Sequence, residues 1–263
     1  MEVAKETERN QPKNMIQPNV FLEADRILHF AHERKIIIRL LGGVGVWFSS
    51  PSASKPMYAR HYHDLDFVGL RKQGRQIESL FEDLGYKTKG LFNKLQGDTR
   101  LLFIDETNGR RIDIFLDKFL MCHEFDFKDR LELRERTLSP ADLLLTKLQI
   151  VEINKKDITD LIALVLDNPM SDEKNPKGQV IEKLRLVGLA SNDWGVWKTL
   201  TMNVDKILSM LSELSIPEGD QEIVRQRLTE LKTSIEDAPK SFSWKMRARV
   251  GDKVKWYVLP ESP

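Results

Sequence analysis

Two aspartates in one short alternating segment most constrain what this 263-residue chain can fold into. They lie within His63–Phe67, about twenty residues after Gly42-Gly43. Side chains alternate across a strand, so Asp64 and Asp66 are predicted on one face and their apolar neighbours on the other. Two carboxylates held side by side repel each other unless a cation lies between them. Mg²⁺ binds carboxylate oxygens and leaves positions for phosphate oxygens, so the pattern predicts metal-assisted phosphoryl chemistry.

A third acidic residue lies in a predicted hairpin. Two strand-like segments flank Asn108-Gly109, which is the strongest short signal for a two-residue type I′ turn. Asp113 interrupts the second segment, where strand propensity disfavours an acid, so we expect it to be exposed or functional. Pairing across that turn places Asp105 opposite Ile112. Asp105 is therefore predicted on the other side of the sheet from Asp113, which leaves Asp113 as the third acid.

Gly42, Gly43, Asp64, Asp66 and Asp113 together resemble the signature of the nucleotidyltransferase superfamily. That family has Gly-Gly or Gly-Ser at a strand end, Asp-x-Asp on the next strand, and a third acid on a later strand. The connection between the glycines and the first acid is longer here, which we interpret as a loop insertion around residues 51–56. The resemblance implies a mixed sheet with flanking helices, in which the three aspartates hold Mg²⁺ and catalyse nucleotidyl transfer.

Phosphate binding is predicted around the glycines. A helix is expected to begin at Val44, so the backbone N–H groups near Gly42 and Gly43 would face a ligand that glycine allows to approach closely. The alternative is a tight strand-to-helix turn without a ligand. Arg60 precedes the acids, and its position is equally consistent with contact to a phosphate and with contact to the loop alone.

Two later helices carry a further candidate. The first begins at Ser139, with Pro140 in the first helical position, and the second covers 157–166. Lys147 lies at the border of the apolar side of the first helix, where a lysine either extends to water or points its ammonium at a triphosphate. With the run Lys156–Leu161, this pair resembles the segment after the core in aminoglycoside nucleotidyltransferases and in abortive-infection-type toxin nucleotidyltransferases. Those families carry a lysine near the nucleotide.

We expect an α/β (α+β) chain with four parts. These are a mobile tail at 1–15, a nucleotidyltransferase-like domain at 16–168, a linker at 169–178, and a helical C-terminal region at 179–263. The segment Ser241–Val258 alternates with period two, which predicts a terminal β-hairpin with a three-residue turn. One face of that hairpin would be basic and aromatic. Such a face either grips single-stranded nucleic acid or is only solvated.

Composition excludes several classes of protein. Lys and Arg total 41 against 40 Asp and Glu, so charge gives no general attraction to nucleic acid or anionic membrane. No apolar run approaches the roughly 20 residues of a membrane span, and the first residues lack a signal-peptide pattern. We therefore expect a cytoplasmic protein. Cys122 is the single cysteine, which excludes an intrachain disulfide and a cysteine-rich zinc site.

The sequence therefore predicts Mg²⁺-dependent transfer of NMP from an NTP to an acceptor hydroxyl on a small molecule or a tRNA. Asp64, Asp66 and Asp113 are the predicted catalytic and metal-binding residues. The predicted nucleotide-binding residues are Gly42, Gly43, Arg60 and Lys147. Two alternatives stay open. One is a nucleotide-binding or regulatory module without catalysis, and the other is a toxin-type nucleotidyltransferase controlled by a partner protein.

Overall fold

The computed structural model describes residues 15–176 and 178–259. The tail predicted at 1–15 lies outside the described residues, apart from Met15. Among the helices formed by the described residues, none combines the length and the apolar composition needed to cross a membrane.

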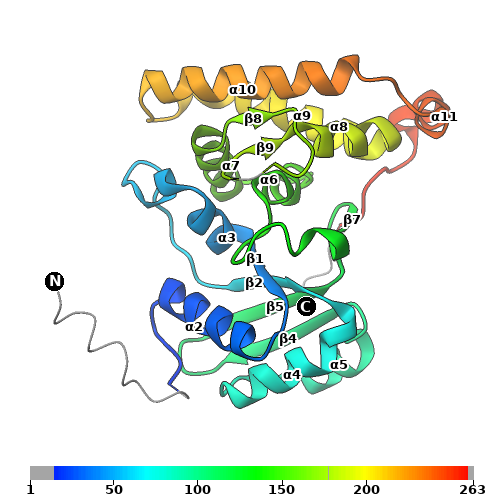
Figure 1. Ribbon diagram of the computed structural model, residues 1–263. Coiled ribbons are helices and arrows are strands. Elements are labelled where there is room, and N and C mark those ends of the chain that lie inside the picture. The colour runs from blue at the N-terminus through cyan, green and yellow to red at the C-terminus, as the bar shows by residue number, and fades with distance from the viewer. Residues whose placement is uncertain (1–14, 177, 260–263) are drawn as a thin grey trace.

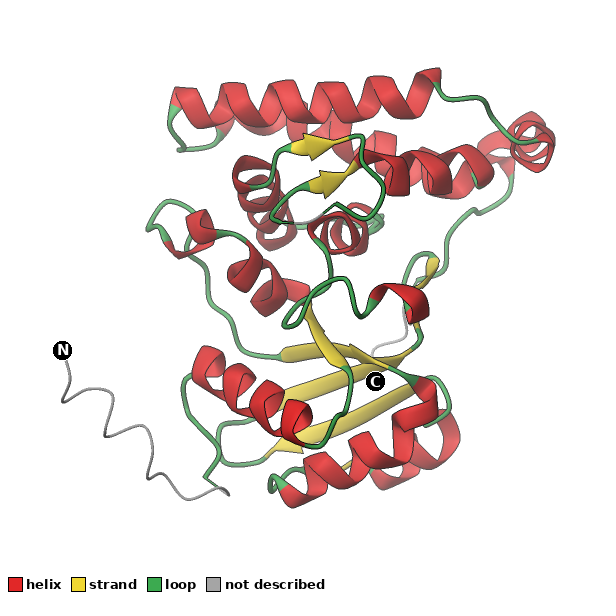
Figure 2. Cartoon of the chain, in the orientation of Figure 1, coloured by secondary structure: helices red, strands yellow, loops and turns green. Residues whose placement is uncertain are grey.

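A mixed five-stranded sheet forms the lower part of the molecule (Figure 1, Figure 2). Its strands lie in the order β1-β2-β5-β4-β3, and β2 and β5 are parallel while the other neighbours are antiparallel. The strands are β1 (Ile38–Leu41), β2 (Leu65–Gly69), β3 (Lys87–Thr88), β4 (Arg100–Asp105) and β5 (Arg110–Leu116). The parallel pair sets Asp66 directly beside Asp113.

One face of the sheet is covered by α2 (Val20–Glu33) and α4 (Gly74–Asp83). Asn19 caps α2, since its Oδ1 accepts hydrogen bonds from the backbone N–H groups of Phe21 (2.9 Å) and Leu22 (3.1 Å). Alternate strand residues such as Phe67 are fully buried against these helices. The intervening residues, which include the candidate acids, therefore point to the opposite face.

The upper part of the molecule is helical (Figure 2). The longer helices here are α6 (Pro140–Leu148), α7 (Lys155–Asp167), α8 (Lys183–Asn192), α9 (Trp194–Met210) and α10 (Glu218–Asp237). Two small sheets accompany them, β6 (Lys118–Leu120) with β7 (Glu124–Asp126), and β8 (Met170–Ser171) with β9 (Ile181–Glu182). The predicted α+β class, with flanking helices and a helical C-terminal region, is confirmed.

Two short helices connect to the sheet. Helix α3 (Gly42–Ser49) begins directly where β1 ends and packs against α6 and α7. Helix α5 (Gly90–Gln96) lies beside β4. Because α3 joins the sheet to the helical part, the residues at its first turn lie between the two.

The predicted terminal β-hairpin is wrong. Residues Phe242–Val250 form helix α11, which Ser241 caps by accepting a hydrogen bond from the Trp244 N–H (3.2 Å). Trp244 lies against Trp197 of α9, with the ring centroids 5.2 Å apart, and Arg247 and Ala248 share that half-buried side. Trp244, Arg247 and Ala248 are spaced by three and four residues, which fits one side of a helix that packs on α9. The period-two alternation was a wrong guide, because the side of this segment that packs on α9 follows the spacing of a helix.

The predicted register of the β4–β5 hairpin is also wrong, by two residues. Asp105 pairs with Arg110, and Asp113 pairs with Leu102. The Asp105 carboxylate accepts hydrogen bonds from the backbone N–H of Asn108 (3.0 Å) and from its side-chain amide (2.8 Å), which closes a four-residue loop. A shift of two residues preserves the faces, so Asp105 still lies on the opposite side from Asp113.

Candidate functional site

The structure brings the three predicted acids to one face of the sheet. Asp66 and Asp113 are in register on parallel neighbouring strands, and such strands lie about 4.8 Å apart. The two side chains therefore lie side by side on one face of the sheet. Asp64 lies immediately before β2 and is about half exposed. Its Oδ1 accepts a hydrogen bond from the Arg111 backbone N–H (3.1 Å) and lies 3.1 Å from His63 Nδ1.

Asp66 is the acid without a partner. Within residues 15–176 and 178–259, no hydrogen bond or ion pair reaches its carboxylate, although the side chain is partly buried. Burial raises the pKa of Asp66 to about 6, with the neighbouring charges of Asp113 and Asp64 adding to the effect and Lys147 opposing it. A bound cation would supply the positive partner that the Asp66 carboxylate lacks, so Asp64 and Asp66 fit a divalent metal ion.

Asp113 is in a different state. Its two oxygens accept hydrogen bonds from Nε (2.6 Å) and from the terminal nitrogen (2.8 Å) of Arg100, and Arg111 Nε lies 3.3 Å away. The side chain is 2% exposed. Among the described residues, no three Asp, Glu, His or Cys side chains are grouped so that they could hold a metal ion. The acids converge, but Asp113 is already neutralised by a guanidinium.

The glycine pair lies directly against two of the candidate side chains. Gly42 has a φ of +63°, and a Cβ at this position would overlap the Asp66 carboxylate. A Cβ on Gly43 would overlap the guanidinium of Arg60. No side chain caps α3 at Leu41, so its first N–H groups keep their capacity to bind an anion. This arrangement is compatible with the predicted phosphate cradle beside the acids.

Gly42→Ala is expected to destabilise the protein by about 3 kcal/mol, because it combines a left-handed backbone with a collision against Asp66. The matched control is Gly109→Ala, which has the same φ of +63° but open space around it. That variant should lose only about 1 kcal/mol. Urea unfolding of both variants measures the difference, and equal losses would show that Asp66 does not pack against Gly42.

Lys147 and Arg60 meet in a buried ionic cluster that also contains Asp157 and Asp160. Lys147 Nζ lies 2.8 Å from Asp157 and 2.8 Å from Asp160. Arg60 binds both oxygens of Asp160, at 2.7 and 2.8 Å. Burial alone would lower the pKa of Lys147, but the carboxylates of Asp160 and Asp157 outweigh it and the pKa is raised. In this arrangement the ammonium of Lys147 is directed at the two aspartates.

Burial also acts to raise the pKa of Asp160, but Lys147 and Arg60 outweigh it and hold that pKa below its usual value of 3.8. Lys147 and Asp160 are therefore both charged at neutral pH. The cluster joins Arg60, which follows the inserted loop, to helices α6 and α7.

The inserted loop between the glycines and the acids is anchored to the helical part. Residues Pro51–Ser54 form a short 3₁₀ helix, η2, in which the Ser52 backbone N–H and hydroxyl bind Asp167 at 2.6 and 2.7 Å. Further along, the Tyr58 hydroxyl donates to Asp220 of α10 (2.6 Å). These contacts fix the segment that precedes Arg60 against the helical part of the molecule.

The prediction of site residues missed Asp160, Tyr62 and Arg100. For Asp160 a signal was present, because Asp157 and Asp160 recur three residues apart on one side of a helix. Tyr62 lies 4.2 Å below the Arg60 guanidinium, and its hydroxyl is buried with no hydrogen-bond partner in the described structure. Burial raises the pKa of Tyr62 to about 12. No local pattern indicates that Arg100 pairs with Asp113.

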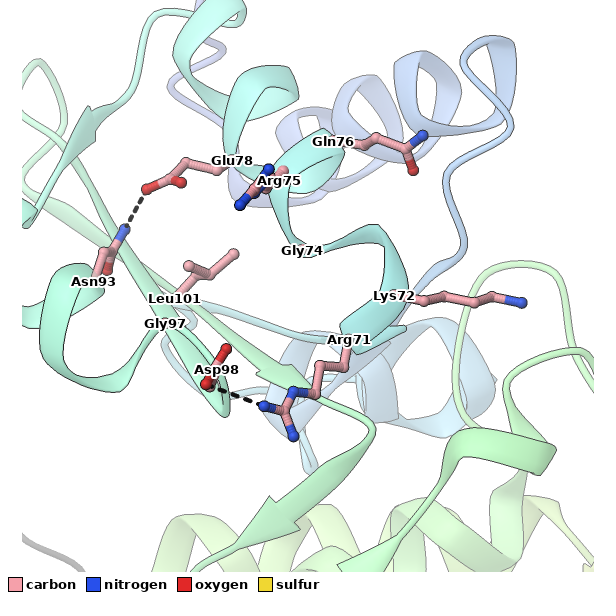
Figure 3. Close-up of a pocket in the computed structure, with 10 residues that line it drawn as sticks. All are labelled: Arg71, Lys72, Gly74, Arg75, Gln76, Glu78, Asn93, Gly97, Asp98 and Leu101. Atoms are coloured by element: carbon pink, nitrogen blue, oxygen red, sulfur yellow. Dashed lines mark hydrogen bonds and ion pairs between the residues drawn. The ribbon is translucent and has the colours of Figure 1, made fainter.

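Two cavities lie away from these residues. The first, of about 500 Å³, lies where α4 begins and includes Arg71, paired with Asp98 at 3.0 Å (Figure 3). The second, of about 640 Å³, is lined by aromatic and basic residues of the C-terminal segment, including Trp244, Arg247 and Trp256. The terminal nitrogens of Arg247 donate to the Gly251 and Val254 carbonyls, both at 2.7 Å. Both of those donors are used within the chain.

Comparisons with known proteins add a distant likeness. A search of protein-family models and of curated proteins finds no match to this chain. Among solved structures, the chain is similar to the antibiotic-resistance factor ANT(2'')-Ia, an aminoglycoside nucleotidyltransferase, with a TM-score of 0.36 and 13% sequence identity. The likeness covers 55% of this chain and 80% of that chain. A TM-score of this size carries no argument about activity, so the function depends on the site itself.

Proposed function

We propose that this protein transfers a nucleoside monophosphate from an NTP to an acceptor hydroxyl, with Mg²⁺ held by Asp64 and Asp66. One observation carries the proposal. Asp66, a partly buried carboxylate that has no hydrogen-bond or ion-pair partner within the described residues, lies beside Asp113 and against Gly42 at the uncapped start of a helix. Carboxylates and uncapped backbone N–H groups thus lie side by side, which supports binding of a triphosphate together with a metal ion.

The residues of this chain would act mainly by positioning and charge. Asp64 and Asp66 would hold the metal ion, which would supply positive charge toward the phosphate groups of the NTP. The N–H groups at the start of α3 would hold the β and γ phosphates. Arg60, fixed by Asp160 over Gly43, would add positive charge from the same side. Lys147 would support this site by fixing Asp160 and thereby Arg60.

A second candidate function is nucleotide binding without transfer. It is favoured by Asp113, whose two oxygens are both bound by Arg100. A nucleotidyltransferase that needed this acid as a free base or as a metal ligand would be inactive in this arrangement. The acceptor of the first candidate is proposed to be a small molecule or a tRNA.

Labelled NTPs incubated with cell extract and the purified protein test the proposal. We expect Mg²⁺-dependent transfer of label to one class of acceptor, and no transfer by the Asp64→Asn/Asp66→Asn double variant. Isothermal titration with each NTP and Mg²⁺ runs in parallel. Binding of an NTP without label on any species would reject transfer and support the second candidate, whereas equal labelling by the double variant would reject the site.

A further inference from the structure

The pairing of Asp113 with Arg100 bears on how many metal ions the site can hold. Sites with two metal ions need carboxylate oxygens that can coordinate both ions, which lie about 3.5–4 Å apart. The acids available here are Asp64, Asp66 and Asp113. Asp64 and Asp66 keep free coordinating capacity, since Asp64 is about half exposed and Asp66 has no partner in the described chain.

Asp113 does not keep that capacity. Arg100 donates to both of its oxygens in a bidentate pair, at 2.6 and 2.8 Å, and Arg111 Nε lies 3.3 Å from one of them. At 2% exposure the carboxylate has little access to water or to ions in solution. Bidentate guanidinium–carboxylate pairs are among the stronger and more geometrically specific hydrogen-bonded contacts in proteins.

Arg100 is itself held in place. Its residue pairs with Phe115 across the β4–β5 ladder, and its guanidinium lies 4.9 Å from the Phe115 ring and 5.8 Å from the Phe92 ring. The side chain is 20% exposed. Two aromatic contacts and a bidentate partner define one position for the guanidinium, on Asp113 of β5, the strand that pairs with the one carrying Asp66.

We infer that Arg100 is a positioning residue that takes the place of a second metal ion, so that the site holds a single divalent cation on Asp64 and Asp66. This inference rests on the proposed function. Asp113 then acts as the anchor for Arg100. The positive charge that a second cation would bring to this side of the site is instead fixed in the protein.

Titration of the full-length protein with Mn²⁺, followed by the electron paramagnetic resonance signal of the free ion, tests the inference. We expect wild type to bind one Mn²⁺ per chain. Asp66→Asn should lose this binding and Asp113→Asn should keep it, because Asp66 is a ligand in the inferred site and Asp113 is not. Arg100→Gln removes both hydrogen bonds to Asp113 and leaves only Arg111, with its Nε 3.3 Å away. The carboxylate then regains coordinating capacity, so this variant should bind a second Mn²⁺ and show the spin coupling of two neighbouring ions.

Two control variants separate this effect from misfolding. Arg100→Lys retains a positive charge beside Asp113 and should still bind one Mn²⁺. The double variant Arg100→Gln/Asp113→Asn replaces the ion pair by two amides, and it should also bind one Mn²⁺. If Arg100→Gln does not fold, the comparison of Asp113→Asn with Asp66→Asn still decides whether Asp113 is a ligand.

Each contrary result has a distinct meaning. Two Mn²⁺ in wild type, or loss of Mn²⁺ in Asp113→Asn as complete as in Asp66→Asn, would overturn the inference while leaving the proposed metal site intact. A count that stays at one in folded Arg100→Gln would overturn the role of Arg100. No binding to wild type would reject the metal site of the proposed function itself.

Discussion

Asp160→Ala is expected to lower the free energy of unfolding by about 3–5 kcal/mol, which is the usual effect of removing one partner from a buried ion pair. Asp160 is 1% exposed and neutralises two cations, Lys147 at 2.8 Å and Arg60 at 2.7 and 2.8 Å. Without it, Arg60 is left largely buried with no carboxylate, and Lys147 keeps only Asp157. Domains of this kind are typically stable by about 5–15 kcal/mol, so the loss is large.

Urea unfolding followed by circular dichroism measures this effect. The matched control is Asp83→Ala, which breaks an ion pair with Arg34 of similar length, 2.7 Å, but with side chains 56% and 40% exposed. Exposed pairs contribute about 0–1 kcal/mol, so the control should unfold nearly as wild type. A loss below about 1 kcal/mol in Asp160→Ala would mean that the cluster does not hold the helical part to the sheet.

The same cluster has a pH signature. The pKa of Asp160 is depressed below 3.8 in the folded protein, so its stabilising contribution is present above the unfolded pKa. The contribution is lost as the pH falls through the folded pKa, in the acid range below 3.8. The gap in stability between wild type and Asp160→Ala should therefore be constant from neutral pH down to about pH 4 and close below it.

Asp66→Asn should abolish activity and stabilise the fold. If Asp66 holds the metal ion as proposed, its loss should reduce pyrophosphate release by about 10³-fold or more. In metal-free buffer at pH 8, however, the same change should raise the unfolding free energy by about 2–3 kcal/mol, because it removes an ionised carboxylate whose pKa the fold raises from 3.8 to about 6.

The sign follows from the direction of the shift. A carboxyl whose pKa is raised on folding contributes stability below its unfolded pKa of 3.8, and this contribution is lost as the pH rises through about 6. The gain from Asp66→Asn should therefore be absent at pH 4 and full above pH 7. Thermal unfolding across this range measures it, and a gain that is the same at pH 4 and pH 8 would disprove the electrostatic origin.

Asp64→Asn is the control for this second prediction. Asp64 is 46% exposed, and its Oδ1 already accepts a hydrogen bond from the Arg111 N–H, so its removal should leave stability within about 0.5 kcal/mol. Activity should nevertheless be lost, as in Asp66→Asn. Stabilisation by both substitutions to the same degree would show that general charge repulsion, and not the buried position of Asp66, sets the effect.

Most of the helices and the central strands could be predicted from local signals. Asn19 and Ser139 cap α2 and α6 through their own side chains, and the glycine pair ends β1 and begins α3. Each of these signals acts within a few residues, so a single sequence carries it. The alternation around Asp64 and Asp66 likewise places both acids on one face, since the side-chain period of a strand is a property of its backbone.

The terminal segment shows where local pattern fails. Residues 244–250 alternate as a strand would, yet they form α11 because Trp244 and its helical neighbours pack on α9. Short segments satisfy more than one period, and the surface that lies beside them decides between the two. The two-residue change in the β4–β5 register has a similar origin, because the Asp105 side chain closes a longer loop than Asn-Gly alone predicts.

By itself, the sequence determined the α+β class, the positions of the glycine pair and the acids, and the face on which Asp64, Asp66 and Asp113 lie. Only the tertiary structure decided which hydrogen bonds and ion pairs these side chains make. Asp66 has no partner in the part of the chain that the structure describes. Asp113 is neutralised by Arg100 from the neighbouring strand, and Lys147 is bound to Asp157 and Asp160 of another helix. The alternation of side chains is local, whereas the charge environment of a carboxylate depends on residues that approach through space.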